Sequence, residues 1–233
     1  MEWQERTVMI TGAAGHLGQA LAADLRARGA RLALLGHDVA SLRRAYVEAP
    51  DLLLLAADLR DAAQVGAATS EAIARFGRIH ALCHIAGGFR MGDAVHETAP
   101  ATWDFLMDVN ARSLVNVARA VVPHLIEHGG GRIVTVGATA ALQGAARMGA
   151  YSASKSALMR LSESMAAELK AHGINVNCVL PSIIDTPENR AAMPDGDPTR
   201  WVAPQALADV IAFLCSDAAR AIHGATIPVR GLA

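Results

Sequence analysis

Short apolar runs of strand length alternate with longer helical patterns along the whole chain. The runs lie at residues 6–11, 30–35, 51–57, 79–86, 132–137, 174–180 and 225–229. The helical patterns cover residues 15–28, 38–48, 61–76, 102–128, 150–172 and 204–216. Because the runs are apolar nearly throughout, the strands should be buried on both faces. This alternation predicts an α/β fold, a doubly wound parallel sheet of about seven strands with helices on both faces.

The chain shows no internal repeat, low-complexity linker or break in composition, so residues 1–233 are predicted to form a single domain. A stretch rich in Pro, Asp and Gly near residues 182–203 follows the sixth apolar run. Its place after a strand suits a lid over a ligand crevice.

Charge and cysteine content exclude several classes of partner. The net charge is −1, so the chain lacks the positive field that nucleic-acid binding requires. No apolar run approaches the length of a membrane span, and the first residues enter a strand directly, so neither a membrane partner nor a signal peptide is expected. The cysteines are odd in number and far apart, which favours a reduced, cytoplasmic protein.

Gly12, Gly15 and Gly18 lie between the first predicted strand and the helix that follows. Glycines there permit a tight turn and let backbone amides and a helix N-terminus approach a pyrophosphate. An ordinary strand-to-helix turn is the alternative. The strand before, the helix after and the continuing alternation favour a dinucleotide-binding Rossmann fold.

Tyr151 and Lys155 lie four residues apart in a predicted helix, and they are scarce residue types in this chain. Only two of the 21 basic residues are lysines, and only two tyrosines occur. The spacing places both side chains on one helix face, where the cation is expected to lower the phenol's pKa and make it a usable proton donor or acceptor. A surface pair without chemistry is the alternative.

Several ordered motifs accompany this pair: "TGAAGHLG" at the first turn, Asp58, "AGG" at 86–88, Asn110, "YSASK" and "NVNCVLPSIIDTP". Together they resemble the short-chain dehydrogenase/reductase family over essentially the whole chain, and the length and the placement of the tyrosine look like its classical branch. The resemblance implies an NAD(P)-dependent oxidoreductase that interconverts a carbonyl and an alcohol on a small-molecule substrate by hydride transfer. It also implies a homo-oligomer, a tetramer or a dimer.

The resemblance assigns roles to single positions. Tyr151 would be the acid/base, Lys155 would hold the nicotinamide ribose and lower the tyrosine's pKa, and Asn110 would anchor a water in a proton relay. The residues implied at the cofactor are Gly12, Gly15, His16, Leu17, Gly18, Gly36, His37, Asp58, Leu59, Ala86, Gly87, Lys155, Pro181, Ile184 and Thr186. Among these, Asp58 would accept from the adenine amino group, and Ile184 and Thr186 would orient the carboxamide. Phe89, Gln143, Met148 and Met193 match the walls of the family's substrate pocket, with plain packing as the alternative.

The chain also departs from the family pattern. Ala138 stands where the family has its catalytic serine, and Thr139 replaces that hydroxyl only if the backbone turns at Gly137–Ala138. The Gly-rich loop carries Gly15 one place early, with His16 at the usual glycine. This spacing resembles the extended branch, whose larger C-terminal domain has little room here. Loss of the serine also admits a second function, a catalytically impaired dinucleotide-binding or regulatory subunit.

The second predicted strand ends at Gly36, where an acidic residue would select NAD over NADP. Without that carboxylate NADP is slightly favoured, and His37 could pair with a 2′-phosphate. Asp38 is as good a helix N-cap as a ribose ligand.

Histidines four apart occur at His80/His84 and His124/His128. No third ligand is spaced beside either pair, so no metal is predicted.

Overall fold

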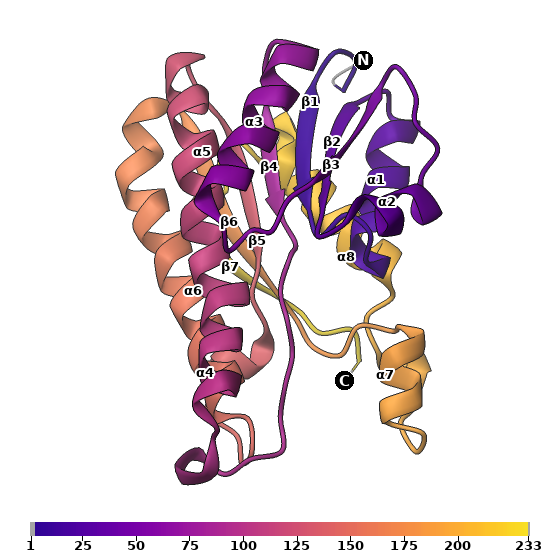
Figure 1. Ribbon diagram of the computed structural model, residues 1–233, viewed down its shortest axis with the longest axis vertical. Coiled ribbons are helices and arrows are strands. Elements are labelled where there is room, and N and C mark those ends of the chain that lie inside the picture. The colour runs from indigo at the N-terminus through magenta and orange to yellow at the C-terminus, as the bar shows by residue number, and fades with distance from the viewer. Residues whose placement is uncertain (1–2, 233) are drawn as a thin grey trace.

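Residues 3–232, described here by a computed structural model, form a seven-stranded sheet with helices on both faces (Figure 1). The strands are β1 (Thr7–Thr11), β2 (Arg31–Gly36), β3 (Leu52–Ala56), β4 (Ala81–His84), β5 (Gly131–Val136), β6 (Ile174–Pro181) and β7 (Thr226–Val229). The α-helices are α1 (His16–Ala27), α2 (Val39–Ala45), α3 (Ala62–Phe76), α4 (Pro100–Met107), α5 (Ser113–Glu127), α6 (Gly149–Leu169), α7 (Pro187–Ala192) and α8 (Pro204–Cys215). Short helical turns lie at Val95–Glu97, Asp108–Arg112, Thr139–Ala141, Lys170–His172, Pro198–Arg200 and Asp217–Ala219.

The strands are parallel and follow the order β3-β2-β1-β4-β5-β6-β7. The chain builds outward from β1 in one direction and then, from β4, in the other. Neighbouring connections therefore diverge between the carboxyl ends of β1 and β4, which is where doubly wound sheets bind ligands. The predicted fold is confirmed.

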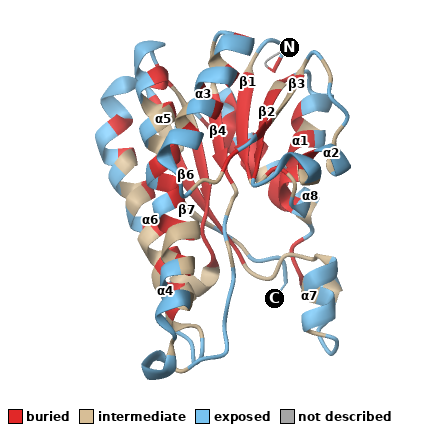
Figure 2. Ribbon diagram, viewed as in Figure 1, coloured by how far each residue is buried: buried red, intermediate tan, exposed pale blue. Residues whose placement is uncertain are grey.

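Successive residues of β1 pack on opposite faces of the sheet, and all are buried (Figure 2). Val8 and Ile10 pack with α1 and α8, whereas Met9 packs with α3, α5 and α6. This two-sided burial is why the strands are apolar throughout their length.

Two predicted elements differ from the structure, and one helix of the structure was not predicted. The fourth strand ends at His84, because residues 85–88 leave the ladder, and the predicted helix at 102–128 is divided by the π-helical turn Asp108–Arg112. The sequence analysis did not anticipate α7, which lies inside the predicted lid. None of the helices in residues 3–232 has both the length and the apolar composition to cross a bilayer.

Candidate functional site

The glycine-rich turn connects β1 to α1 and depends on two close backbone approaches. Gly12 has a φ of +68°, and a Cβ there would lie 2.8 Å from the amide nitrogen of Ala86. A Cβ on Gly18 would lie 2.5 Å from the carbonyl oxygen of Gly12. Gly15, the N-cap of α1, makes no side-chain cap, so the first amides of this helix are free to bind an anion. The turn therefore fits a pyrophosphate.

Gly15 and His16 make different contacts from Gly12 and Gly18. The nearest atom to a Cβ on Gly15 would be the oxygen of Gly12, at the ordinary contact distance of 3.5 Å. His16 extends from the loop toward α7, where its Nε2 lies 3.2 Å from Glu188. Leu17 is buried beneath the loop. The close approaches thus belong to Gly12 and Gly18.

Asn110 lies fully buried in the π-helical turn between α4 and α5. Its Oδ1 accepts the amide of Gly88 at 2.9 Å, and its Nδ2 donates to the carbonyl of Gly88 at 3.0 Å and to Ser154 Oγ at 2.9 Å. A π-turn places a side chain differently from an α-helix, and such turns recur at functional sites. Asn110 therefore fixes the segment after β4 against α6.

Lys155 is fully buried and donates from Nζ to the carbonyl of Val136 at 2.9 Å. A Cβ on Gly87 would lie 2.8 Å from Lys155 Nζ and 2.9 Å from Asn110 Oδ1. The absence of a side chain at Gly87 thus lets the lysine, the asparagine and the segment after β4 meet. Burial lowers the pKa of Lys155 to about 8.

Tyr151 lies one turn before Lys155, and its ring packs edge-on against Phe89 with 4.8 Å between the ring centroids. Burial raises the pKa of Tyr151 to about 12. The expectation that Lys155 lowers this pKa is wrong for the protein alone, because desolvation dominates and the ammonium is directed to Val136.

The backbone just after β5 bears on whether Thr139 can supply the hydroxyl that the family pattern expects at position 138. Ala138 is extended, with φ −160° and ψ 150°, and a 3₁₀ turn begins at Thr139. The backbone therefore stays extended through Ala138 and turns one residue later than the turn at Gly137–Ala138 that Thr139 would need. Within residues 3–232 the Thr139 hydroxyl makes no hydrogen bond.

A buried polar chain that the sequence analysis missed connects β1, β4 and the π-turn. Ser113 Oγ donates to the carbonyl of Val109 at 2.7 Å, so it accepts from His84 Nε2 at 3.3 Å. His84 Nδ1 then accepts from Thr11 Oγ1 at 3.1 Å, and this oxygen accepts the amide of Ala86 at 3.3 Å. Burial lowers the pKa of His84 to about 3, which keeps the ring neutral. The sequence signal for this polar chain was His84, a histidine inside an otherwise apolar strand.

Beside the end of β2, Asp38 is a helix N-cap. Its two oxygens accept from the amide and the hydroxyl of Ser41 at 2.7 and 2.8 Å. Gly36 ends the strand as expected, and a Cβ there would lie 2.9 Å from Leu42 Cγ. His37 is exposed. No free carboxylate therefore stands at this position in the described chain.

Asp58, the expected adenine contact, is hydrogen-bonded to Arg60. Arg60 donates to both carboxylate oxygens, which lowers the pKa of Asp58 to about 2. The neighbouring Leu59 carbonyl accepts from Asn116 at 2.9 Å. An adenine amino group would therefore share Asp58 with Arg60.

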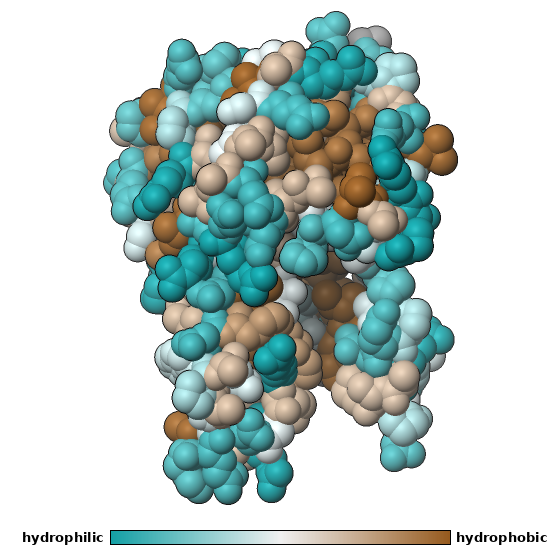
Figure 3. All heavy atoms as spheres, in the orientation of Figure 1, coloured by the Kyte–Doolittle hydropathy of each residue, from teal (hydrophilic) through white to brown (hydrophobic). Residues whose placement is uncertain are grey.

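The segment after β6, which begins at Pro181, carries the expected carboxamide contacts. The carbonyl of Ile184 accepts from Asn189 Nδ2 at 2.8 Å. Thr186 caps α7 by accepting the amide of Asn189 at 3.2 Å, and its side chain also hydrogen-bonds the Glu188 carboxylate. Figure 3 shows the surface hollowed between this segment and the body of the molecule, with apolar residues in its depth.

The expected pocket residues are only partly brought together. Phe89 contacts Tyr151, and Met148 lines a cavity beside the start of α6. Gln143 is exposed on the loop after β5, and Met193 ends α7. Neither Gln143 nor Met193 lines this cavity.

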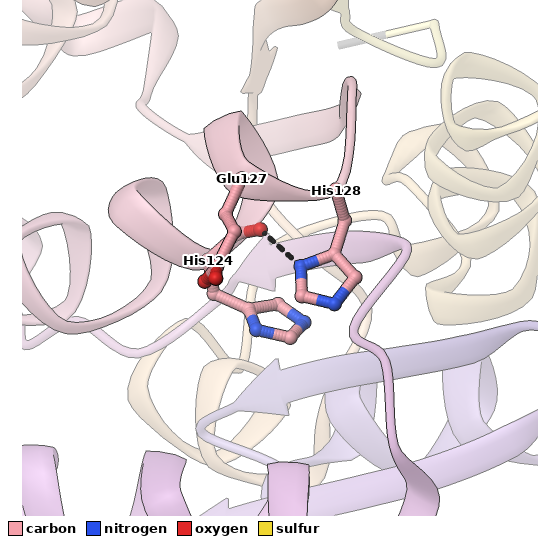
Figure 4. A group of neighbouring side chains, drawn as sticks. All are labelled: His124, Glu127 and His128. Carbon is pink, nitrogen blue, oxygen red and sulfur yellow. Dashed lines mark hydrogen bonds between the residues drawn. The ribbon is translucent and has the colours of Figure 1, made fainter.

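One histidine cluster resembles a metal site. His124, Glu127 and His128 lie on the last turn of α5 with ligand atoms within 4.8 Å of one another (Figure 4), which corrects the expectation of no third ligand. However, His124 Nε2 accepts the amide of Ile79 at 3.1 Å, so its Nδ1 keeps the proton and cannot ligate. His128 Nδ1 is bonded to the His124 carbonyl. We therefore assign no metal to this cluster.

Comparisons with known proteins agree with this geometry. A family profile described as "short chain dehydrogenase" matches residues 6–196. The chain is 30% identical to 2-dehydro-3-deoxy-D-gluconate 5-dehydrogenase of Dickeya dadantii, over 98% of this chain and 95% of that protein. It is 33% identical to D-threitol dehydrogenase of Mycolicibacterium smegmatis, over 97% and 92%. The structure of 3-ketoacyl-(acyl-carrier-protein) reductase from Brucella melitensis complexed with NADH matches with a TM-score of 0.90 and 28% identity, over 98% of both chains.

Proposed function

Since the chain belongs to the short-chain dehydrogenase family, we propose that Tyr151 is the acid/base of its reaction. The chain is an NAD(P)-dependent oxidoreductase that acts on carbonyl and alcohol groups, as its relatives do. One observation carries the assignment of the site. A Cβ on Gly87 would touch both Lys155 Nζ and Asn110 Oδ1, and Lys155 lies one helical turn after Tyr151 on α6. The preceding residue, Ala86, lies against Gly12 of the glycine-rich turn.

A nicotinamide dinucleotide held at this site would supply or accept the hydride. Gly12 and Gly18 leave room for its pyrophosphate, and the amides that begin α1 bind it. Tyr151 donates its phenolic proton to the substrate oxygen during reduction and takes it back during oxidation. Lys155, whose pKa near 8 lets it exchange protons close to neutral pH, resupplies Tyr151 and binds the nicotinamide ribose. Asn110 holds Gly88 in place and anchors a relay water.

Two parts of this site depart from the family pattern. Ala138 occupies the serine position, so the second donor to the substrate oxygen comes from Thr139, a water or the substrate itself. Residues 182–203 form a lid, supported by the contact between His16 and Glu188 that connects it to the Gly-rich loop.

Screening the purified protein with NADH and NADPH against ketones, quinones and aldehydes tests this function. We expect turnover of at least one carbonyl substrate, with loss of NAD(P)H absorbance matched by product. Binding of the dinucleotide without turnover of any substrate in such a panel would instead favour the dinucleotide-binding or regulatory subunit.

We propose a slight preference for NADP over NAD. Asp38 is occupied as a helix cap, so no carboxylate repels a 2′-phosphate there, and His37 is exposed beside it. Gly36→Asp should shift the NADP/NAD affinity ratio toward NAD. Gly36→Ala is the matched control, because any side chain there displaces Leu42. Equal ratios in the two variants would contradict the proposal.

We also propose a homo-oligomer, a tetramer or a dimer, in the reducing cytoplasm. Trp103, Val115 and Phe213 are large apolar side chains left exposed on α4, α5 and α8. The three cysteines are buried and unpaired, which suits a reducing compartment. Light scattering that reports a monomer would remove the oligomer.

A further inference from the structure

A cavity of about 200 Å³ lies beside the start of α6, between the segment after β4 and the loop after β5. Two of its lining residues are chain neighbours of Tyr151 and of the ring that packs on it. Ala150 lines it and precedes Tyr151 in the chain. Arg90 also lines it and follows Phe89, whose ring packs against Tyr151. The cavity is smaller than the pockets of drug-sized ligands, so it suits part of a small molecule.

Two arginines in this lining lack a carboxylate partner. Within the described residues neither Arg90 nor Arg147 forms an ion pair. The Arg90 guanidinium lies 3.8 Å from the centroid of the Phe105 ring, an arrangement that leaves the edge of the guanidinium free to donate. Asp93 is the one acidic residue of the lining, so the lining carries one excess positive charge. That balance suits a monoanion better than a doubly charged phosphate.

Arg147 has an unusual backbone conformation, and two hydrogen bonds with Gly92 hold it in place. Arg147 has a φ of +62°, a region that side-chain-bearing residues seldom adopt. Gly92 donates its amide to the carbonyl of Arg147 at 2.9 Å, and Arg147 Nη1 donates to the carbonyl of Gly92 at 3.2 Å. These bonds tie the two loops together across the cavity and leave the remaining guanidinium donors of Arg147 for a ligand.

Backbone amides add to the positive potential. The N-cap of α6, Met148, makes no side-chain cap, and the first amide bonded across this turn is that of Ser152. The amides of Gly149 and Ala150, both in the cavity lining, therefore have no partner in the described chain. Free amides at the start of a long helix favour an anion.

We propose that this cavity binds a carboxylate of the substrate, so that the enzyme acts on small oxo acids and hydroxy acids. This inference rests on the proposed function, because it places the reacting carbonyl at Tyr151. Arg90 and Arg147 bind the carboxylate and determine specificity, and they take no part in proton transfer.

The test compares matched substrates in four variants. A series of oxo acids, with one to four carbons between the carbonyl and the carboxylate, is assayed beside the methyl esters and the phosphate-bearing analogues. The variants are Arg90→Met, Arg147→Met, Arg147→Lys and, as a control, Arg160→Met, which removes an arginine paired with Glu163 elsewhere on α6. Charged hydrogen bonds of this kind are worth about 10- to 100-fold each.

We expect the best acid to exceed its ester in kcat/KM by about 10- to 100-fold or more, given two such arginines. Either Arg→Met variant should lose about that factor on the acid alone, Arg147→Lys should keep part of it, and Arg160→Met should match the wild type. The proposal would be overturned if the methyl esters had the same kcat/KM as the acids. It would also be overturned if the Arg→Met variants lost kcat/KM equally on acids and esters. Preference for the phosphate analogues would overturn the assignment to a carboxylate.

A binding measurement separates this inference from the proposed function. Saturated carboxylic acids of the best chain length should raise the Tm of wild-type protein and leave that of Arg147→Met unchanged. If no carbonyl is reduced with either nucleotide, the proposed function fails, while this Tm shift still supports the anion site. If carbonyls are reduced but acids neither shift Tm nor react faster, only the carboxylate proposal fails.

Discussion

The two halves of the candidate site are built by different means. On the side of β1 and α1, atoms of the backbone make the site, and glycines at positions 12 and 18 create the room. On the side of β4, β5 and α6, buried side chains make it, with Asn110, Ser154 and Lys155 enclosed between elements distant in sequence. A backbone site depends on steric room alone, whereas a side-chain site depends on which segments desolvate one another.

The electrostatics of the two halves differ for the same reason. At α1 the first helix amides have no side-chain cap and keep their partial charge. At α6 desolvation shifts the pKa values of Tyr151 and Lys155 toward the neutral form. Desolvation, absent from a sequence motif, sets the protonation of the second half.

The largest expected effect comes from a substitution in the side-chain half of the site alone. Tyr151→Phe keeps the ring that packs on Phe89 but removes the proton donor. We expect kcat to fall by at least about 10³- to 10⁴-fold, to no measurable turnover, with unchanged dinucleotide affinity. Steady-state kinetics and a nucleotide fluorescence titration measure both quantities. Full activity on every substrate would show that another group is the acid.

The second largest effect is expected from a substitution in the backbone half of the site, at β1 and α1. Gly12→Ala places a methyl group against the backbone of residue 86 and strains a φ of +68°, so nucleotide affinity should fall by about 100-fold or more. Gly15→Ala is the matched control, because a Cβ there makes only an ordinary contact at 3.5 Å. Fluorescence titration of both variants, with thermal unfolding to confirm the fold, decides the point. Equal affinities would refute the steric argument.

A third prediction sharpens the electrostatic contrast. The folded pKa of Lys155, about 8, lies below its ordinary value of 10.5. Between these values the unfolded chain binds more protons than the folded chain, so this lysine makes the free energy of unfolding rise with pH. Its contribution is fully present above the ordinary value and is lost as pH falls through 8. Between pH 8 and 9.5 the free energy of unfolding should rise by about 2 kcal/mol less in Lys155→Met than in the wild type.

Urea unfolding of wild type and Lys155→Met across that range measures this difference directly. Subtracting the two curves cancels the titration of groups distant from Lys155, which both proteins share, whereas Cys178 is electrostatically coupled to Lys155 and belongs to the measured difference. Parallel curves would mean that Lys155 is not desolvated in the folded protein.

The smallest expected effect concerns the end of β5. Ala138→Ser should raise kcat on a simple carbonyl substrate by about tenfold, less than the full 10²- to 10³-fold of one preorganised donor, because another donor already contributes. Thr139→Ala then identifies that donor: a large fall in kcat assigns it to Thr139, and no change assigns it to water or substrate. A fall in kcat for Ala138→Ser would show that position 138 does not face the reacting oxygen.

Local patterns in the sequence determined the strands, the class of sheet, the need for glycine at positions 12 and 18, and the pairing of Tyr151 with Lys155 on one face. Each depends on periodicity or on steric room within a few residues. Asp38 as a helix cap is of the same kind, since its partner is three residues away.

Only the tertiary structure decided the rest. It divided the predicted helix at 102–128 with a π-turn, directed Lys155 to Val136, enclosed His84, and placed Arg90 and Arg147 around one cavity. It also raised the tyrosine's pKa, where spacing had predicted the opposite. The reason is physical, because desolvation and hydrogen-bond partners depend on how distant segments pack, and no single segment carries that information.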